Sequence, residues 1–199
     1  MRKVAIVPSA GDSIRFGADK LLADIGPNDP RHGDPILHCT IVSLLNGGVD
    51  DVFVVIRPDM ADAIAAVPII ALATAKHVHV LINGMHRNGM FSSIQVGVAA
   101  SEADVYAVIP GDMPFVRPET VRAVMDAWSS RGGIVSPRNN GKRGHPVALP
   151  RSLRAEILAG DPTSNLHEVI KKHLDERHDL EVDDPGINRD VDRPEDLTR

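Results

Sequence analysis

The residues of this chain that could bind a phosphate group gather in residues 9–20. This segment contains Gly11 and Gly17 together with the cations Arg15 and Lys20. Small residues let the backbone approach a ligand, and backbone N–H groups in such a loop can face phosphate oxygens. A triphosphate would need both these donors and the positive charge. The alternative is a glycine-containing loop with two solvated cations, because a match of this kind is a weak signal alone.

A carboxylate suited to a divalent cation lies in a second segment, where Asp112 stands between Pro110 and Pro114. Mg²⁺ prefers one or two protein carboxylates together with substrate phosphates. The other interpretation is a turn in which Asp112 accepts hydrogen bonds from nearby backbone N–H groups.

Three further polar segments leave similar alternatives open. Ser92 and Ser93 begin a predicted helix, where hydroxyl groups either contact a ligand or cap the helix. Residues 141–147 place glycines around two cations and His145, as a loop gripping an anionic acceptor or as an exposed hairpin turn. His145 receives no acid–base role. Asp190 and Asp192 precede a predicted helix start and could bring a second carboxylate to the metal.

Apolar runs alternate with helical patterns along the chain. The runs predict strands at residues 4–7, 51–56, 77–82, 105–109 and 133–136. The 3.6-residue patterns predict helices at residues 35–46, 91–100, 118–129, 153–158 and 165–173. Near-continuous Val and Ile runs are typical of strands buried on both faces, so we expect an α/β domain with a mainly parallel sheet. Ligands of such sheets bind beyond the carboxyl ends of the strands, where residues 9–20 and Asp112 fall.

Composition excludes several other classes of protein. The chain has 199 residues, 43% of them hydrophobic and 25% charged, which fits one ordinary domain. A net charge of −5 argues against a general nucleic-acid binder. Cys39 is the only cysteine, so no disulfide within the chain and no cysteine-based zinc site is expected, and a reducing cytosol is indicated. The first apolar run is too short for a signal peptide or a membrane span. His167, His173 and His178 lack the spacing of a helical zinc-binding pair.

Five segments in this order resemble the MobA-like NTP-transferase family. Residues 8–20 are similar to its opening signature L-A-A-G-x-S-x-R-F/M-G-x-x-K, and residues 88–97 to E-G-M-x-x-S-L-x-x-G. Residues 111–114, 144–147 and 190–197 are similar to G-D-M/Q-P, G-H-P-V and D-I-D-T-P-E-D-L. Together the motifs span nearly the whole chain and are far more specific than any one of them.

The resemblance implies a Rossmann-like nucleotidyltransferase fold, a three-layer α/β/α domain over residues 1–199. It also implies a cytoplasmic, Mg²⁺-dependent enzyme that joins a nucleoside triphosphate to a phosphorylated acceptor. Within the family the motifs resemble the molybdenum cofactor cytidylyltransferase branch. That branch implies CTP as donor, molybdopterin as acceptor and a molybdoenzyme as recipient of the product, with neither nucleic acid nor membrane as a partner.

The resemblance carries over site residues one by one. The implied nucleotide-binding residues are Pro8, Ser9, Ala10, Gly11, Ser13, Arg15, Lys20, Ser92, Ser93 and Asp112. Of these, Arg15, Lys20 and Asp112 would be catalytic. The implied metal ligands are Asp112 and Asp190, and the implied acceptor-binding residues are Gly144, His145 and Asp190.

The chain departs from the family pattern at three places. Pro8 and Ser9 replace the usual Leu and Ala, Phe91 replaces Ser, and the loop of residues 26–35 is longer. Ala10 stands where guanylyltransferases tend to have Gly, which favours a pyrimidine nucleotide. The alternatives are a guanylyl donor, a methylerythritol phosphate or sugar phosphate acceptor, or a non-catalytic carrier of the molybdenum cofactor. Mg²⁺-dependent release of pyrophosphate would separate an enzyme from a carrier.

Overall fold

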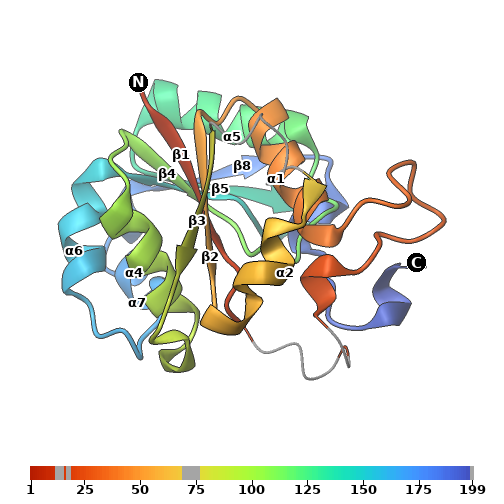
Figure 1. The fold of residues 1–199 in the computed structure, drawn as a ribbon. Helices are drawn as coiled ribbons and strands as arrows, with labels where there is room; N and C mark the ends of the chain where they lie inside the picture. Colours follow the sequence, from red (N-terminus) through yellow and green to blue (C-terminus); the bar gives the residue numbers. More distant parts are fainter. Residues whose placement is uncertain (12–15, 17–18, 69–76, 198–199) are drawn as a thin grey trace.

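The computed structural model describes residues 1–11, 16, 19–68 and 77–197. Within these residues, an eight-stranded sheet lies between two layers of helices (Figure 1). None of the helices in this part of the chain is both long and apolar enough to cross a membrane.

Four neighbouring parallel strands form one half of the sheet, in the order β3-β2-β1-β4. Their bounds are β1 (Lys3–Pro8), β2 (Asp51–Ile56), β3 (Val78–Ile82) and β4 (Val105–Val108). Most residues of β1, β2 and β4 are buried, which is why these strands appear in the sequence as continuous apolar runs. All four predicted strands are confirmed.

The other half of the sheet mixes directions. Its strands are β5 (Ile134–Asn139), β6 (Lys142–Arg143), β7 (Val147–Pro150) and β8 (Arg177–Glu181). β7 pairs antiparallel with β4 and β5, β6 pairs antiparallel with β5, and β8 pairs parallel with β5. Six of the eight strands in the described residues therefore point the same way, which confirms the mainly parallel sheet. Of these four strands, only β5 was predicted.

The helices cover both faces of the sheet, as Figure 1 shows. One face carries α1 (Ile36–Asn46), α2 (Ala61–Ala65) and α5 (Pro118–Arg131). The other carries α4 (Met90–Ala100), α6 (Arg154–Ala159) and α7 (Leu166–Lys171). Successive residues of β1 alternate between the two cores: Ala5 and Val7 pack in the first, Val4 and Ile6 in the second. The three-layer α/β/α prediction is confirmed.

The order of the strands opens a crevice at one edge of the sheet. The chain leaves β1 toward β2 on one side, whereas β4 adds to β1 on the other side. The strand order thus reverses between β1 and β4, so their carboxyl ends form a topological switch point, although the helices that follow them, α1 and α5, cover the same face of the sheet. α4 packs directly against β1 here, because a Cβ on Gly97 would overlap the side chain of Ile6. This close packing brings the start of α4 beside the end of β1.

Candidate functional site

Backbone hydrogen bonds hold the two strand ends of the crevice together. Gly111 N donates to Pro8 O at 3.3 Å, and Ser9 N donates to Val55 O at 2.7 Å. A Cβ at position 111 would overlap the hydroxyl group of Ser9, so a larger residue there would force the Ser9 side chain to turn. Ser9 is itself buried, and its hydroxyl donates to Val7 O at 3.3 Å. Ser9 therefore acts here as a packing residue at the base of the crevice.

Lys20 and Asp112 meet across this crevice, although 92 positions separate them in the chain. Lys20 Nζ lies 2.5 Å from Asp112 Oδ2 and 3.1 Å from Asp192 Oδ1. The side chains of Lys20 and Asp112 are only 15% and 17% exposed. Burial acts to lower the pKa of Lys20, but hydrogen bonds and charges of Asp112 and Asp192 outweigh it, so this pKa stands above its ordinary value. Lys20 is therefore a fixed positive charge at neutral pH.

The other carboxylate oxygen of Asp112 is available to a ligand. Asp112 Oδ1 is buried and has no hydrogen-bond partner among the described residues. Asp112 and Asp190 line the same cavity. The described part of the chain contains no group of three or more His, Cys, Asp or Glu that could hold a metal unaided. This donor set fits Mg²⁺, which takes one or two carboxylates and completes its shell with phosphates and water.

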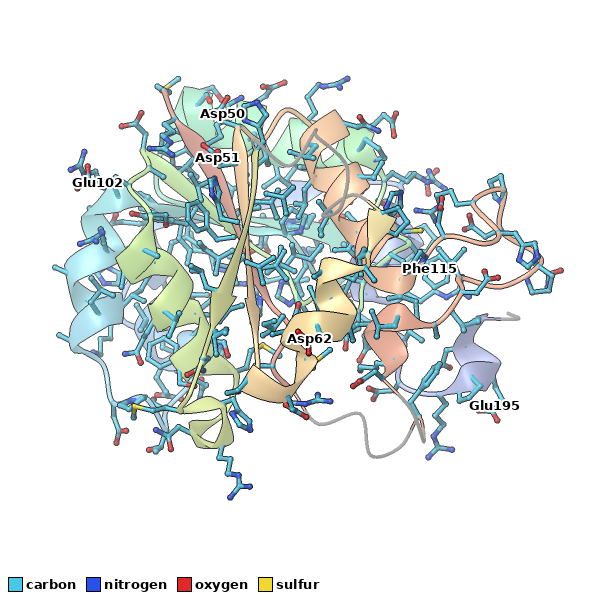
Figure 2. All side chains as sticks on the ribbon, viewed as in Figure 1. Asp50, Asp51, Asp62, Glu102, Phe115 and Glu195 are labelled. Atoms are coloured by element: carbon cyan, nitrogen blue, oxygen red, sulfur yellow. The ribbon has the colours of Figure 1, made fainter. Side chains whose placement is uncertain are left out.

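The C-terminal segment is anchored so that Asp190 reaches this cavity. Val191 N donates to Asp112 O at 2.9 Å. The guanidinium carbon of Arg189 lies 3.8 Å from the centroid of the Phe115 ring, a cation–π contact. Figure 2 shows Phe115 on the same side of the molecule as Glu195 of this segment. These contacts place Asp190 next to the loop that follows β4.

A hollow of about 90 Å³ lies between the end of β1 and the start of α4. Its lining residues are Pro8, Ala10, Gly11, His86, Gly89, Met90 and Ser93. Asn83, buried at the end of β3, donates to Ser93 Oγ at 3.0 Å. Among the described residues the Ser93 hydroxyl finds no acceptor of its own, so its proton can point to a ligand. Four predicted nucleotide-binding residues, Pro8, Ala10, Gly11 and Ser93, thus share one hollow.

Ser92 occupies a different place from Ser93. Its hydroxyl donates to Gly89 O at 2.7 Å and accepts from Asn83 Nδ2 at 2.9 Å. Ser92 lines a separate cavity on the outer side of α4, beside Gln95. The structure therefore gives Ser92 a role in fixing the first turn of α4 and does not bring it to the hollow beside Pro8.

A larger cavity of about 480 Å³ lies next to the first one, and Met90 lines both. Its polar lining residues are Asp112, Arg143, His145, His167, Arg177, Asn188 and Asp190. Its apolar lining residues are Met90, Pro110, Met113, Val147, Leu166, Ile170 and Ile187, with Gly144 between the two groups. The predicted acceptor-binding residues Gly144, His145 and Asp190 are thus brought together with Asp112.

His145 and Gly144 have structural reasons for their identity. His145 Nδ1 lies 3.1 Å from Val108 O, and because a carbonyl only accepts, Nδ1 carries the proton. Burial lowers the pKa of His145 below 6.5, against the hydrogen bond to Val108 and the charges of Asp112 and Asp190. The ring is therefore neutral. A Cβ on Gly144 would overlap the carbonyl of Ile187, so a larger residue would push the cavity wall apart.

Two predicted residues of the phosphate loop, Ser13 and Arg15, lie outside the described residues. The ends of that loop are held by Arg57, which follows β2. Arg57 donates to Gly11 O at 2.9 Å and to Asp19 Oδ1 at 2.5 Å. Sequence reasoning missed Arg57, and its place directly after a buried strand was the one signal that marked it.

The acidic pair at the start of β2 belongs to the opposite edge of the sheet. Figure 2 shows Asp50 and Asp51 near the beginning of the chain. Asp51 Oδ2 binds Arg2 Nη2 at 3.0 Å, and Asp50 Oδ2 accepts from Lys3 N at 2.7 Å. These carboxylates pin the N-terminus to β2 and lie away from the crevice.

Comparison with known proteins agrees with this fold. A sequence model of the MobA-like NTP transferase domain matches residues 5–178. The chain is 22% identical over 126 residues to a molybdenum cofactor cytidylyltransferase of Escherichia coli K12, and the match spans 63% of each chain, less than two thirds of that relative.

Solved structures share the fold. The crystal structure of Rv0371c from Mycobacterium tuberculosis superposes with a TM-score of 0.78 at 22% identity, over 100% of this chain and 97% of the other. A manganese complex of Rv0371c superposes with a TM-score of 0.70 at 18% identity, over 92% and 88%. The nucleotidyl transferase Mth528 from Methanothermobacter thermautotroptrophicus gives 0.76 at 22% identity, over 100% and 95%.

Proposed function

This chain belongs to the MobA-like NTP transferase family, and from that premise we propose that it transfers CMP from CTP to the phosphate of molybdopterin. Membership makes it a nucleotidyltransferase acting on a nucleotide and a small acceptor. The observation that carries the finer proposal is the Lys20–Asp112 pair. Asp112 lines the large cavity, and that cavity adjoins the small hollow at Met90. One hollow suits a nucleotide, and the other suits an acceptor.

The donor is assigned from the smaller hollow. Ala10 and Gly11 line it at the end of β1, and Ser93 lines it from α4 with a hydroxyl group. A volume of about 90 Å³ favours the smaller pyrimidine ring over a purine. We assign Ser13 and Arg15, together with Lys20, to the triphosphate. Arg57 binds Gly11 and Asp19, described residues that precede and follow Ser13 and Arg15 in the chain.

The acceptor is assigned from the larger cavity. Its walls combine apolar side chains with an equal number of polar or charged ones, which suits a small organic ligand that carries anionic groups. The E. coli relative, which is named molybdenum cofactor cytidylyltransferase, supports molybdopterin as the ligand. A molybdoenzyme would then receive the product. Cys39 is a free, buried thiol, which suits a reducing cytoplasm as the compartment.

The proposed reaction exchanges one phosphoanhydride for another. An oxygen of the acceptor phosphate forms a bond to the α-phosphorus of CTP, the bond from that phosphorus to the β-phosphate oxygen breaks, and pyrophosphate leaves with the electron pair. The attacking oxygen is already anionic, so no general base is needed. Lys20 supplies a positive charge that stabilises the phosphates.

Asp112 and Asp190 would hold Mg²⁺, with Asp112 Oδ1 as its first ligand. Bound there, Mg²⁺ would neutralise charge on the transferring and leaving phosphates. The manganese complex of Rv0371c supports a divalent cation on this fold.

Thermal unfolding with CTP, GTP, ATP and UTP, each with and without Mg²⁺, tests the donor and metal assignments. A ligand at about 100 times its Kd adds roughly 2.7 kcal/mol of stability. For a domain of this size each kcal/mol raises Tm by about 2–4 °C. We expect the largest rise with CTP and Mg²⁺ together, and its loss in Asp112→Asn. An equal rise with all four nucleotides, or a rise independent of Mg²⁺ and Asp112, would contradict the proposal.

A further inference from the structure

Arg177, the first residue of β8, lines the large cavity and carries a donor without a hydrogen-bond partner among the described residues. Its Nε is buried and has no hydrogen-bond partner in the part of the chain that the structure describes. Its Nη2 donates to Ser136 Oγ at 3.1 Å, a neutral partner that leaves the charge unbalanced. A buried cationic group with an unpaired donor destabilises the free protein. An anion that accepts a hydrogen bond from this donor would therefore bind favourably.

The carboxylate whose charge acts on Arg177 is already occupied. Asp179 accepts two hydrogen bonds from Arg143, at 2.6 Å to Nε and 2.8 Å to Nη2. Burial and then the positive charge of Arg143 lower the pKa of Arg177, while Asp179 only partly opposes them. Arg143 and Asp179 thus neutralise each other and leave Arg177 as the uncompensated cation of this part of the cavity.

We propose that Arg177 binds a second anionic group of the acceptor, distinct from the phosphate that attacks the nucleotide. This inference rests on the proposed function, which assigns the large cavity to the acceptor. A guanidinium presents N–H groups in a planar fork that matches the oxygens of phosphate, carboxylate and other oxyanions.

Arg177 and the reacting phosphate are separated along the sheet by the width of the strands between them. Asp112 follows β4, and β7 and β5 lie between β4 and β8. At about 4.8 Å per strand, β4 and β8 are roughly 14 Å apart. The apolar side chains of Val147 and Ile170 line the cavity along with both groups. The acceptor class that fits is an elongated molecule with an apolar or planar middle, a phosphate at one end and an oxyanion or similar anion at the other.

Side-chain ¹⁵N NMR of the full chain during titration with inorganic phosphate tests this site. The Nε–Hε signal of Arg177 is assigned from its loss in Arg177→Lys. Arg154 is a matched internal control, because its Nε is also buried without a partner but Arg154 does not line the cavity. We expect the Arg177 signal to shift saturably, and the Arg154 signal to stay in place, at constant ionic strength. The Lys20→Met variant should keep the response, which separates this site from the triphosphate site.

An Arg177 signal that does not move, or that moves only in step with Arg154, would overturn the assignment. The titration measures binding and needs no turnover, so its result does not depend on the proposed function. A saturable shift in a protein that has no transferase activity would contradict the proposed function but support the anion site. In an active enzyme, Arg177→Lys should raise KM for the acceptor by roughly tenfold or more and leave KM for CTP unchanged. An equal rise in both would count against the acceptor assignment.

Discussion

Lys20 holds two carboxylates at the crevice, and its removal should destabilise the protein measurably. In Lys20→Met the apolar stem remains, but Asp112 and Asp192 lose the ammonium group at 2.5 Å and 3.1 Å. An exposed ion pair contributes about 0–1 kcal/mol, whereas breaking a buried pair costs about 3–5 kcal/mol. Because Lys20 and Asp112 are mostly buried and Asp192 is 40% exposed, we expect a loss of about 2 kcal/mol. Tm should fall by about 4–8 °C.

A double-mutant cycle tests the reason for that loss. Once the ammonium is gone, Asp112→Asn removes the unpaired charge, so the double variant should be more stable than the sum of the single changes predicts. We expect a coupling of about 1 kcal/mol or more, from urea denaturation of the four proteins. Lys20→Met combined with Asp192→Asn is the matched control, with a smaller coupling because Asp192 is more exposed. Additivity within about 0.5 kcal/mol for the Asp112 cycle would refute the reasoning.

Three other outcomes are expected. Because the pKa of buried His145 lies below 6.5, the unfolded chain takes up a proton that the folded chain does not as the pH falls through 6.5. The stability that the neutral ring contributes above that pH is then lost. The free energy of unfolding of His145→Asn should therefore depend less on pH than that of the wild-type protein between about 5 and 7.5. The same pH dependence in both proteins would contradict a buried neutral ring. Gly144→Ala should lower the free energy of unfolding by about 1–3 kcal/mol, because its Cβ would overlap the carbonyl of Ile187. Gly84→Ala, whose Cβ would have nothing within 4 Å, should lower it by less than about 0.5 kcal/mol. Equal losses in urea denaturation would contradict this packing. Burial raises the pKa of Cys39 to about 11, so a disulfide reagent at neutral pH should label it only after unfolding, and rapid labelling of the native protein would show an accessible thiol.

Three of the five strands predicted from the sequence have a uniform environment; β3 and β5 were also predicted although they are only partly buried, and the mostly buried β7 was missed. β1, β2 and β4 are buried on both faces, so every position favours an apolar side chain. β8 was missed because it lies at an edge and is only partly buried, with the sequence Arg-His-Asp-Leu-Glu. β6 has two exposed residues, too few for any pattern.

The candidate site was predictable where its residues are local to a motif. Lys20 and Asp112 could each be singled out, but their contact depends on β1 and β4 being neighbours in the sheet. Arg57 and Arg177 were missed because their importance lies in partners distant in sequence, Gly11 and Ser136. Ser92 and Ser93 look equivalent in sequence. Successive residues of an α-helix point about 100° apart, so only Ser93 lines the hollow beside Pro8 and Ser92 lines a separate cavity.

Transfer of label from α-³²P CTP to molybdopterin, with pyrophosphate measured in parallel, tests the central claim most directly. We expect Mg²⁺-dependent labelling of the acceptor with one pyrophosphate released per transfer. Asp112→Asn should lower turnover by about 10²- to 10³-fold, as expected for a group that stabilises charge at the reacting phosphates. Asp51→Asn, at the opposite edge of the sheet, should leave turnover unchanged. Near-normal turnover by Asp112→Asn, or no labelled acceptor from the wild-type protein with CTP and Mg²⁺, would contradict the account.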